Sequence, residues 1–222
     1  MDVPLPFDKL ALKLVDEKSL HETISNGKTH VVLVATGSFN PPTFMHLRMF
    51  ELARDALNSE GYCVIGGYMS PVNDAYKKKA TQSTYQRTLT VLSRVRNCIS
   101  KAGLVPRESL KVMLICGSDL LHSFGIPGVW ISEQVKAICK DYGVVCIRRE
   151  AQDVERTISD NDILNENRQA NIKVVDEIVP NQISSTRLRE CIARRLSIKY
   201  LTVDEVIDYI REHKLYLSSN GN

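Results

Sequence analysis

Thr43 and His46 lie three residues apart, where an apolar run gives way to an amphipathic stretch. Between them and the run stand Gly37, which allows a sharp turn and close approach of a ligand, and Pro41-Pro42, which cannot continue a strand. Thr43 suits the start of a helix, whose free amide groups attract phosphate, and His46 shares one face of its first turn. An imidazole there can donate a hydrogen bond to an anionic oxygen. We therefore favour an anion site over a plain surface histidine.

A second helix start carries a similar set of polar groups. Ser184-Ser185-Thr186 precedes an amphipathic stretch, and Arg189 follows Thr186 by three residues. Hydroxyl groups and a guanidinium at a helix start suit a polyphosphate, although serine and threonine there can also be only caps. Gly117-Ser118-Asp119 ends another apolar run, where Asp119 can accept from ribose hydroxyls or simply cap the next helix.

These motifs are separated by alternating apolar runs and amphipathic stretches. The alternation predicts an α/β fold, a Rossmann-like parallel sheet with helices on both faces, and ligands in such sheets bind beyond the carboxyl ends of the strands. Gly143 is expected to close one helix, and Thr202 with Glu205 is expected to form a capping box for the last. The predicted strands are His30–Ala35, Tyr62–Met69, Lys111–Cys116, Val144–Arg148 and Asn171–Val175, and the predicted helices are Thr43–Leu57, Tyr85–Ser100, Ser132–Asp141, Ser185–Leu196 and Thr202–His213.

The bulk composition is that of an ordinary globular domain. The chain has 222 residues, 43% of them apolar, and a net charge of +3, which argues against a nucleic-acid partner. None of the six cysteines has the spacing of a zinc or redox motif, and three lie inside apolar runs, so a reducing compartment is expected. Neither a signal peptide nor an apolar run of membrane-spanning length is evident. We expect the nucleus or cytoplasm and no membrane partner.

The first strand is not followed by G-x-G-x-x-G, nor by G-x-x-x-x-G-K-[ST], so hydride-transfer Rossmann enzymes and P-loop enzymes are disfavoured. The stretch resembles instead the T/H-x-x-H signature of the nucleotidyltransferase superfamily. The longer string GSFNPPTFMHLRMFELA (Gly37–Ala53) resembles the eukaryotic type of nicotinamide/nicotinic acid mononucleotide adenylyltransferase. Four further strings resemble the same family in the same order: SPVNDAYKKK (70–79), CGSDLL (116–121), PGVW (127–130) and ISSTRLR (183–189).

The resemblance implies roles for individual residues of this sequence. His46 and Arg189 would be catalytic. Arg148 would contact the nucleotide, while its neighbour Arg149 can be merely solvated, and the lysine run 77–79 would meet substrate phosphate. ATP and its phosphates would be bound by Gly37, Ser38, Phe39, Thr43, His46, Ser185, Thr186 and Arg189. The nicotinamide nucleotide or NAD would be bound by Ser38, Phe39, Lys78, Gly117, Asp119, Val129, Trp130, Arg148 and Asn181.

The reaction implied is adenylyl transfer from ATP to nicotinamide mononucleotide or nicotinic acid mononucleotide, which gives NAD or its deamido form and pyrophosphate. The acceptor brings its own nucleophile, so catalysis would consist of positioning and charge neutralisation. Mg²⁺ would be held mainly by the ATP phosphates, because no carboxylate cluster for a metal is evident. Residues 1–29 are expected to be a leader, 30–217 one nucleotidyltransferase domain and 218–222 a disordered tail. The sequence leaves a homo-oligomer open.

One segment departs from the family pattern. Members carry more chain after the position of Lys79, including an edge strand and a tryptophan that stacks on nicotinamide, whereas Lys79 here runs directly into Ala80. Removing the edge strand from the order 3-2-1-4-5-6 leaves five main strands in the order 2-1-4-5-6, with the second strand exposed at the edge. The alternative function is therefore a weakly active or inactive nucleotide-binding, chaperone-like subunit.

Overall fold

The computed structural model describes residues 4–11, 28–71, 87–149 and 153–217. Its five strands are β1 (His30–Gly37), β2 (Cys63–Pro71), β3 (Leu110–Gly117), β4 (Val144–Ile147) and β5 (Ile172–Val175). Its α-helices are α2 (Phe44–Ser59), α3 (Arg87–Lys101), α4 (Ser118–Ser123), α5 (Ser132–Ala137), α6 (Val154–Ser159), α7 (Asp162–Asn171), α8 (Ser185–Ala193) and α9 (Asp204–Glu212). Two short 3₁₀ turns, Phe7–Lys9 and Arg107–Ser109, and a π-helical turn, Ile138–Tyr142, complete the elements.

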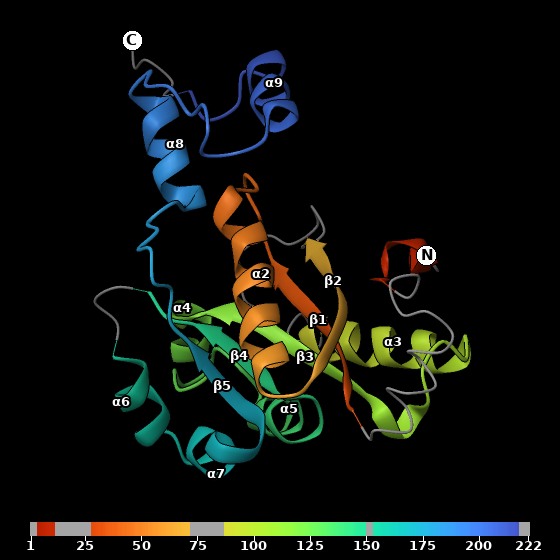
Figure 1. Ribbon diagram of the computed structural model, residues 1–222. Helices are drawn as coiled ribbons and strands as arrows, with labels where there is room; N and C mark the ends of the chain where they lie inside the picture. Colours follow the sequence, from red (N-terminus) through yellow and green to blue (C-terminus); the bar gives the residue numbers. More distant parts are fainter. Residues whose placement is uncertain (1–3, 12–27, 72–86, 150–152, 218–222) are drawn as a thin grey trace.

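All five strands run parallel in one sheet, in the order β2-β1-β3-β4-β5 (Figure 1). The predicted order, counted with the family's absent edge strand 3, is the same arrangement, so the prediction of the fold class is confirmed. Strand β2 lies on one side of β1 and β3 to β5 lie on the other, so the strand order reverses between β1 and the central strand β3. Ligands of such sheets bind at this reversal, beyond the carboxyl ends of the strands.

Each face of the sheet is covered by helices because the central strands are apolar on both sides. Along β1, Val31, Leu33 and Ala35 face a core shared with α2, while Val32 and Val34 face a core shared with α3 to α7. All five side chains are buried. Full burial of a valine or leucine side chain contributes about 1.5–3 kcal/mol each, so this strand anchors both layers.

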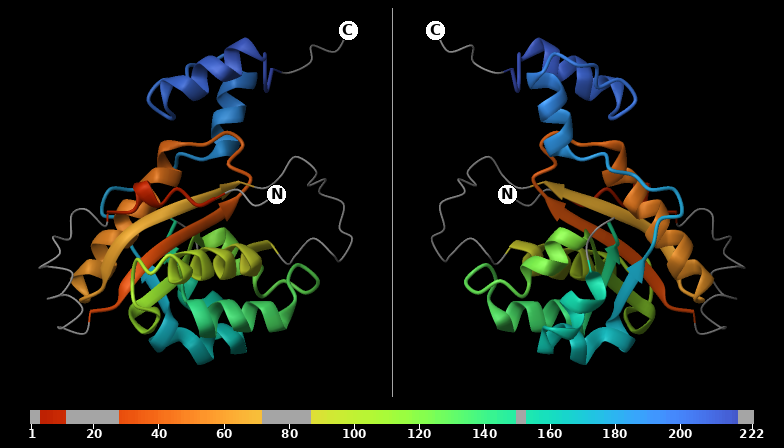
Figure 2. Two further views of the ribbon diagram at one scale, coloured as in Figure 1. Left: turned by 90° about the vertical axis from the view of Figure 1, so that its right-hand side faces the viewer. Right: turned by 90° about the vertical axis from the view of Figure 1, so that its left-hand side faces the viewer.

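The C-terminal helices α8 and α9 lie beyond the sheet layers, next to the N-terminal end of α2 (Figures 1 and 2). They bury a small apolar cluster of their own, built from Leu188, Ile192, Ile198, Ile207 and Ile210. The loops after the strands and the start of α8 lie at the carboxyl end of the sheet (Figure 1). This is the geometry that the sequence motifs require.

Several local predictions differ from the structure. Helices α4, α6 and α7 were not predicted: α4 and α6 have six residues each, too few for a clear helical period, and α7 buries only Leu164 of its ten residues. The capping box of Thr202 and Glu205 is wrong, since α9 has Val203 at its N-cap without a side-chain cap. Gly143 does close the preceding helical segment, with a φ of +99° that favours glycine.

Candidate active site

The loop after β1 is the first component of the site. Gly37 ends the strand, and the ring of Phe39 lies against it, so that a Cβ at Gly37 would be 3.4 Å from the ring. Phe39 has a φ of +43°, a conformation that L residues rarely adopt. The Asn40–Pro41 peptide is cis. Ser38, at the tip of this loop, is exposed.

Thr43 and His46 form a capping box at the start of α2. The backbone N–H of Thr43 donates to Nδ1 of His46 at 3.0 Å, and the Thr43 hydroxyl lies 2.8 Å from the same nitrogen. Because Nδ1 accepts, the hydrogen of the neutral ring is on Nε2. His46 therefore presents a donor to a ligand, as the sequence motif predicts.

Two amide groups in the first turn of α2 have backbone partners. The Phe44 N–H donates to the carbonyl of Leu201 at 3.1 Å, and the His46 N–H donates to the carbonyl of Thr43 at 3.0 Å. These two amides are therefore already paired, and the phosphate contact at this helix start stays a prediction. The imidazole of His46 is a further donor at the same helix start.

The environment of His46 keeps its ring neutral. Burial lowers the pKa of His46 below its usual value of 6.5, and the positive charge of Arg149 lowers it further. The ring of Phe39 packs edge-on against the imidazole, with ring centroids 5.1 Å apart. A neutral imidazole with its hydrogen on Nε2 can donate to a phosphate oxygen without gaining a proton first.

The ends of β3 and β4 supply the second component. Arg149 donates from Nη1 to Oδ2 of Asp119 at 3.0 Å, and its backbone N–H donates to the hydroxyl of Ser118 at 3.0 Å. Its guanidinium lies over Gly117, where an added Cβ would be 3.6 Å from Nε. The predicted residues Gly117 and Asp119 therefore lie close together, and both are near Arg149. The charge of Arg149 also acts on His46.

The two neighbouring arginines pair with different acidic residues. Arg148 lies with acidic groups of other elements, its Nη2 donating to Glu155 at 3.2 Å and its Nε 2.6 Å from Asp176 without hydrogen-bond alignment. Its backbone N–H still pairs with Val175 of β5. Because the side chains alternate at the end of β4, only Arg149 lies over Gly117. The contact of Arg148 with the nucleotide stays a prediction, and Arg149 is the arginine that the structure places at the end of β3.

The start of α8 forms the third component. Ser184 caps the helix by accepting from the Arg187 N–H at 3.2 Å. The Ser185 hydroxyl donates to the carbonyl of Pro41 at 2.8 Å, and Arg189 donates from Nη1 to the carbonyl of Asn40 at 2.6 Å. These bonds join the two predicted phosphate-binding regions across 144 and 149 residues of sequence.

Arg189 also donates from Nη2 to the hydroxyl of Thr186 at 3.1 Å, which confirms that these residues share one face of α8. Tyr216, beyond α9, donates its hydroxyl to Oδ1 of Asn40. Thr202 donates its hydroxyl to the carbonyl of Pro42 at 2.8 Å. Neither contact was predicted: Tyr216 belongs to no motif, Thr202 was expected to cap a helix, and their partners lie 176 and 160 residues away.

Other predicted residues lie elsewhere. The indole N–H of Trp130 donates to Ser123 at 2.9 Å, and its ring packs edge-on against Phe124, so the described contacts place it beside α4. Val129 belongs to the same loop, in a turn closed by its N–H and the carbonyl of Ile126. Lys78 lies outside the described residues.

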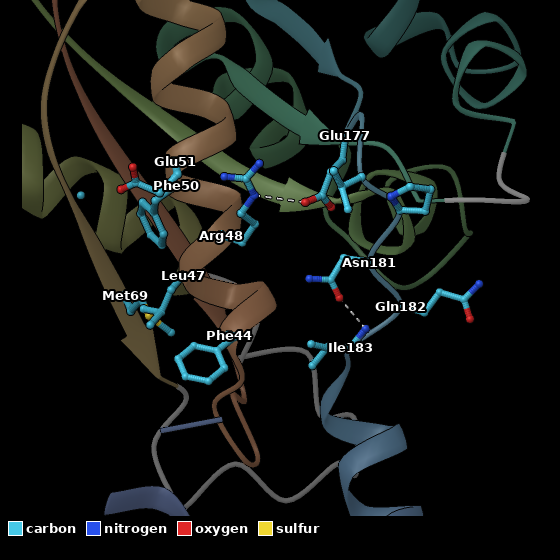
Figure 3. Close-up of a pocket in the computed structure, with 13 residues that line it drawn as sticks. Phe44, Leu47, Arg48, Phe50, Glu51, Met69, Glu177, Asn181, Gln182 and Ile183 are labelled. Atoms are coloured by element: carbon cyan, nitrogen blue, oxygen red, sulfur yellow. Dashed lines mark hydrogen bonds and ion pairs between the residues drawn. The ribbon is translucent and has the colours of Figure 1, made fainter. Parts of the chain in front are cut away.

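Asn181 lies in the segment between β5 and α8. Its Oδ1 accepts from the backbone N–H of Ile183 at 2.9 Å, and it lines a groove of about 1110 Å³ along the outer side of α2 (Figure 3). Across this groove Arg48 pairs with Glu177 at 3.1 Å. Among the described residues, no contact joins the Asn181 side chain to His46 or to Asp119.

The part of the chain that the structure describes holds no group of three histidine, cysteine, aspartate or glutamate side chains arranged to bind a metal. Among the described helices, none is long and apolar enough to cross a membrane. The functional groups of the site are an imidazole, two guanidinium groups, hydroxyl groups and a helix start. This combination suits a multiply charged phosphate ligand.

Comparison with known proteins bears on the identity of the chain. Residues 34–191 match the cytidylyltransferase-like family. A nicotinamide/nicotinic acid mononucleotide adenylyltransferase of Arabidopsis thaliana is 61% identical over 97% of this chain and 98% of its own length. The proteins of that name from rice and, with the suffix 1, from cattle are 57% and 36% identical, over 100% and 87% of this chain and 97% and 91% of their own lengths.

The alignments also bear on the length difference. The alignment with the rice protein has 251 positions and takes in all 222 residues of this chain, so about 29 positions have no counterpart here. The Arabidopsis alignment, with 244 positions over 97% of the chain, gives the same difference. The relatives are thus longer within the matched region. That the extra residues follow Lys79 stays a prediction, because this point lies outside the described residues.

Proposed function

Because the chain belongs to the nicotinamide/nicotinic acid mononucleotide adenylyltransferase family, we propose that it transfers the adenylyl group of ATP to such a mononucleotide in NAD biosynthesis. The observation that carries the proposal is His46, which is held by Thr43 with Nδ1 as acceptor and Nε2 as donor. The products are NAD, or its deamido form, and pyrophosphate.

In the reaction an oxygen of the acceptor's 5′-phosphate bonds to the α-phosphorus of ATP. The bond from that phosphorus to the oxygen bridging to the β-phosphate breaks, and its electron pair leaves with pyrophosphate. No side chain has to act as a nucleophile. The protein's task is to align the reactants and to balance the negative charge that shifts onto the leaving group.

His46 donates from Nε2 to a phosphate oxygen of ATP. The neutral state fits this role, because protonation of Nδ1 would break its bond with the Thr43 N–H. Donors of this kind change kcat by about 10²–10³-fold when removed. The pKa lowered by burial and by Arg149 keeps the imidazole in this state at neutral pH.

Arg189 and Arg149 supply positive charge on either side of the phosphates. Arg189 now donates to the carbonyl of Asn40, and a phosphate would be a stronger acceptor for the same guanidinium. The start of α8, with Ser185 and Thr186, adds amide groups that favour an anion. Arg149, paired with Asp119, is proposed to take the nucleotide contact expected of Arg148.

We propose Mg²⁺ as the divalent cation. It would be held mainly by the phosphates of ATP, where it would neutralise charge. Asp119 is a carboxylate at this edge, and its ion pair with Arg149 suits a ribose or amide contact better than a metal site. ATP and the mononucleotide are the substrates proposed, and the compartment proposed is the nucleus or cytoplasm.

The experiment is a NAD-formation assay of the purified full chain with ATP and Mg²⁺, in which nicotinamide and nicotinic acid mononucleotide are each varied to high concentration. We expect both dinucleotides to form and expect His46→Ala to lower kcat by about 10²–10³-fold. The matched control is His122→Ala, since His122 is an exposed histidine of α4.

The shorter chain sets what the KM values will mean. Turnover with a KM for the mononucleotide above that of the longer rice relative would show that the 29 or so positions absent here serve acceptor binding only. A folded protein that binds ATP but forms no dinucleotide would contradict the proposal. The comparisons give the non-catalytic alternative no support of its own.

A further inference from the structure

Two consecutive residues of the turn before α9 hold both sides of Thr43. The Thr202 hydroxyl donates to the carbonyl of Pro42 at 2.8 Å, and the Phe44 N–H donates to the carbonyl of Leu201 at 3.1 Å. Thr202 is only 2% exposed, so water is a poor substitute for its bond. The peptide groups before and after Thr43 are therefore fixed by the same short segment.

Thr43 in turn fixes His46, through its N–H and its hydroxyl, both at Nδ1. If the Thr43 peptide moved, its N–H would move away from Nδ1 of His46. That N–H is the donor that keeps the hydrogen of the imidazole on Nε2. We propose that Thr202 is a positioning residue for adenylyl transfer, acting on His46 through Pro42 and Thr43. This inference rests on the proposed function, but its effect on the imidazole is measurable without turnover.

The segment that carries Thr202 is itself ordered. Lys199 pairs with Asp204 at 2.6 Å and forms an isolated bridge with Thr202, and Tyr200 between them has a φ of +66°. The N–H of Leu201 donates to the carbonyl of Ile198 at 3.1 Å. A turn braced in this way can transmit a fixed position to its partner, which a freely moving loop cannot.

A purely structural role for the Thr202 hydroxyl is disfavoured by two observations. It does not cap α9, because the N-cap is Val203. Nor is it alone in joining the C-terminal helices to the loop after β1, since Ser185 and Arg189 donate to the carbonyls of Pro41 and Asn40. Removing the hydroxyl should leave the helices joined to the loop and disturb mainly the neighbourhood of Thr43.

The test uses Thr202→Val in the full chain, with Thr157→Val as its matched control. Thr157 also donates its hydroxyl to a backbone carbonyl, that of Asp153 at 3.1 Å, but in the remote helix α6. We expect Thr202→Val to lower kcat by about tenfold to a hundredfold, as misplacement of a catalytic group does, with the KM for ATP changed much less. The Thr157 variant should keep both constants.

A second readout needs no substrate. Nitrogen-15 NMR of the imidazole reports which ring nitrogen carries the hydrogen. In the wild type Nδ1 of His46 should be the unprotonated nitrogen, and in Thr202→Val a measurable share of the other tautomer should appear. Thr202→Ser, which keeps the hydroxyl, should restore both the signal and kcat.

Unchanged nitrogen signals and a kcat within about twofold of the wild type in folded Thr202→Val would overturn the proposal, since twofold is below the effect expected of a displaced catalytic group. Thermal unfolding checks that the variant is folded. If it is not, Thr202→Ala replaces it, because alanine adds no methyl group where the hydroxyl lies. Should the wild type form no dinucleotide, the NMR comparison still decides the positioning claim separately from the proposed function.

Discussion

Nη1 of Arg149 lies 3.0 Å from Oδ2 of Asp119, so the ends of β4 and β3 are joined by an ion pair beyond the carboxyl edge of the sheet. The same guanidinium lies close enough to His46 to lower the pKa of its imidazole. One arginine therefore links the residue proposed to meet the nucleotide with the residue proposed to meet the phosphates.

Replacing Arg149 by glutamine should have two effects. It should lower kcat/KM by about tenfold or more, through loss of a charge-assisted contact. It should also raise the pKa of His46, because one of the two influences that lower it is gone. Since the neutral imidazole is the active form, the acid side of the pH–rate profile should move to higher pH.

Arg148→Gln is the matched control for that measurement, because Arg148 pairs with Glu155 and Asp176 instead. Its pH–rate profile should keep the position of the wild type. An acid limb that moves in the Arg148 variant but not in the Arg149 variant would show that the two side chains have been assigned to the wrong places.

Arg189→Lys should lower kcat/KM for ATP by about tenfold. Lysine keeps the charge, but it cannot donate at once to Asn40 and Thr186 as the forked guanidinium does. Arg187→Lys is the control, since Arg187 is an exposed arginine of the same helix. Steady-state kinetics with ATP varied would reveal the difference, and equal effects of the two substitutions would contradict the assignment.

Gly67→Ala should destabilise the fold by about 1–3 kcal/mol, the usual cost of overpacking. A Cβ at Gly67 would lie 2.5 Å from the ring of Phe50, which packs between α2 and β2. Chemical denaturation gives the free energy of unfolding. The double variant with Phe50→Leu should recover part of the loss.

Gly125→Ala is the control for this pair, because the nearest atom to its Cβ would be 3.5 Å away, an ordinary contact. If Gly67→Ala is as stable as Gly125→Ala, the close packing of Phe50 on β2 is not a constraint on the sequence.

His30 should make the protein less stable in mild acid. It is 1% exposed, neither ring nitrogen has a hydrogen-bond partner among the described residues, and burial lowers its pKa. Below pH 6.5 the imidazole of His30 takes up a proton in the unfolded chain but resists it in the folded chain. The free energy of unfolding therefore decreases as the pH is lowered, by at most about 1.4 kcal/mol per pH unit. His30→Leu removes this contribution.

Denaturation curves at pH 6.5 and 5.5 measure the slope. The His30→Leu variant should lose less stability between the two values than the wild type, because it lacks the buried imidazole whose pKa is lowered. An identical slope in His30→Leu and wild type would mean that His30 does not resist protonation in the folded state.

Much of the fold was predictable because its signals are local. The apolar runs predict five strands, and their alternation with amphipathic stretches predicts a parallel sheet, which β1 to β5 form. Thr43 and His46 were predictable as a pair, since helical spacing alone puts them on one face. The direct bond between them, and hence the ring tautomer, follows from side-chain geometry that spacing does not supply.

The remaining features depend on contacts between distant parts of the chain. Which of Arg148 and Arg149 lies over Gly117 depends on the side-chain alternation where β4 ends, and the sequence shows only two adjacent arginines. Thr202 resembles a helix cap in sequence, but its hydroxyl meets a carbonyl 160 residues earlier. Tertiary hydrogen bonds of this kind override local preference.

Adenylyl transfer by this chain can be followed with ATP labelled on the α-phosphorus, mixed with the full chain, Mg²⁺ and nicotinamide mononucleotide. We expect the label to appear in NAD, label on the γ-phosphorus to appear in pyrophosphate, and both signals to fall sharply in His46→Ala. A folded protein that binds ATP yet leaves the α-label in ATP, or transfers it equally well without His46, would show that His46 does not support adenylyl transfer here.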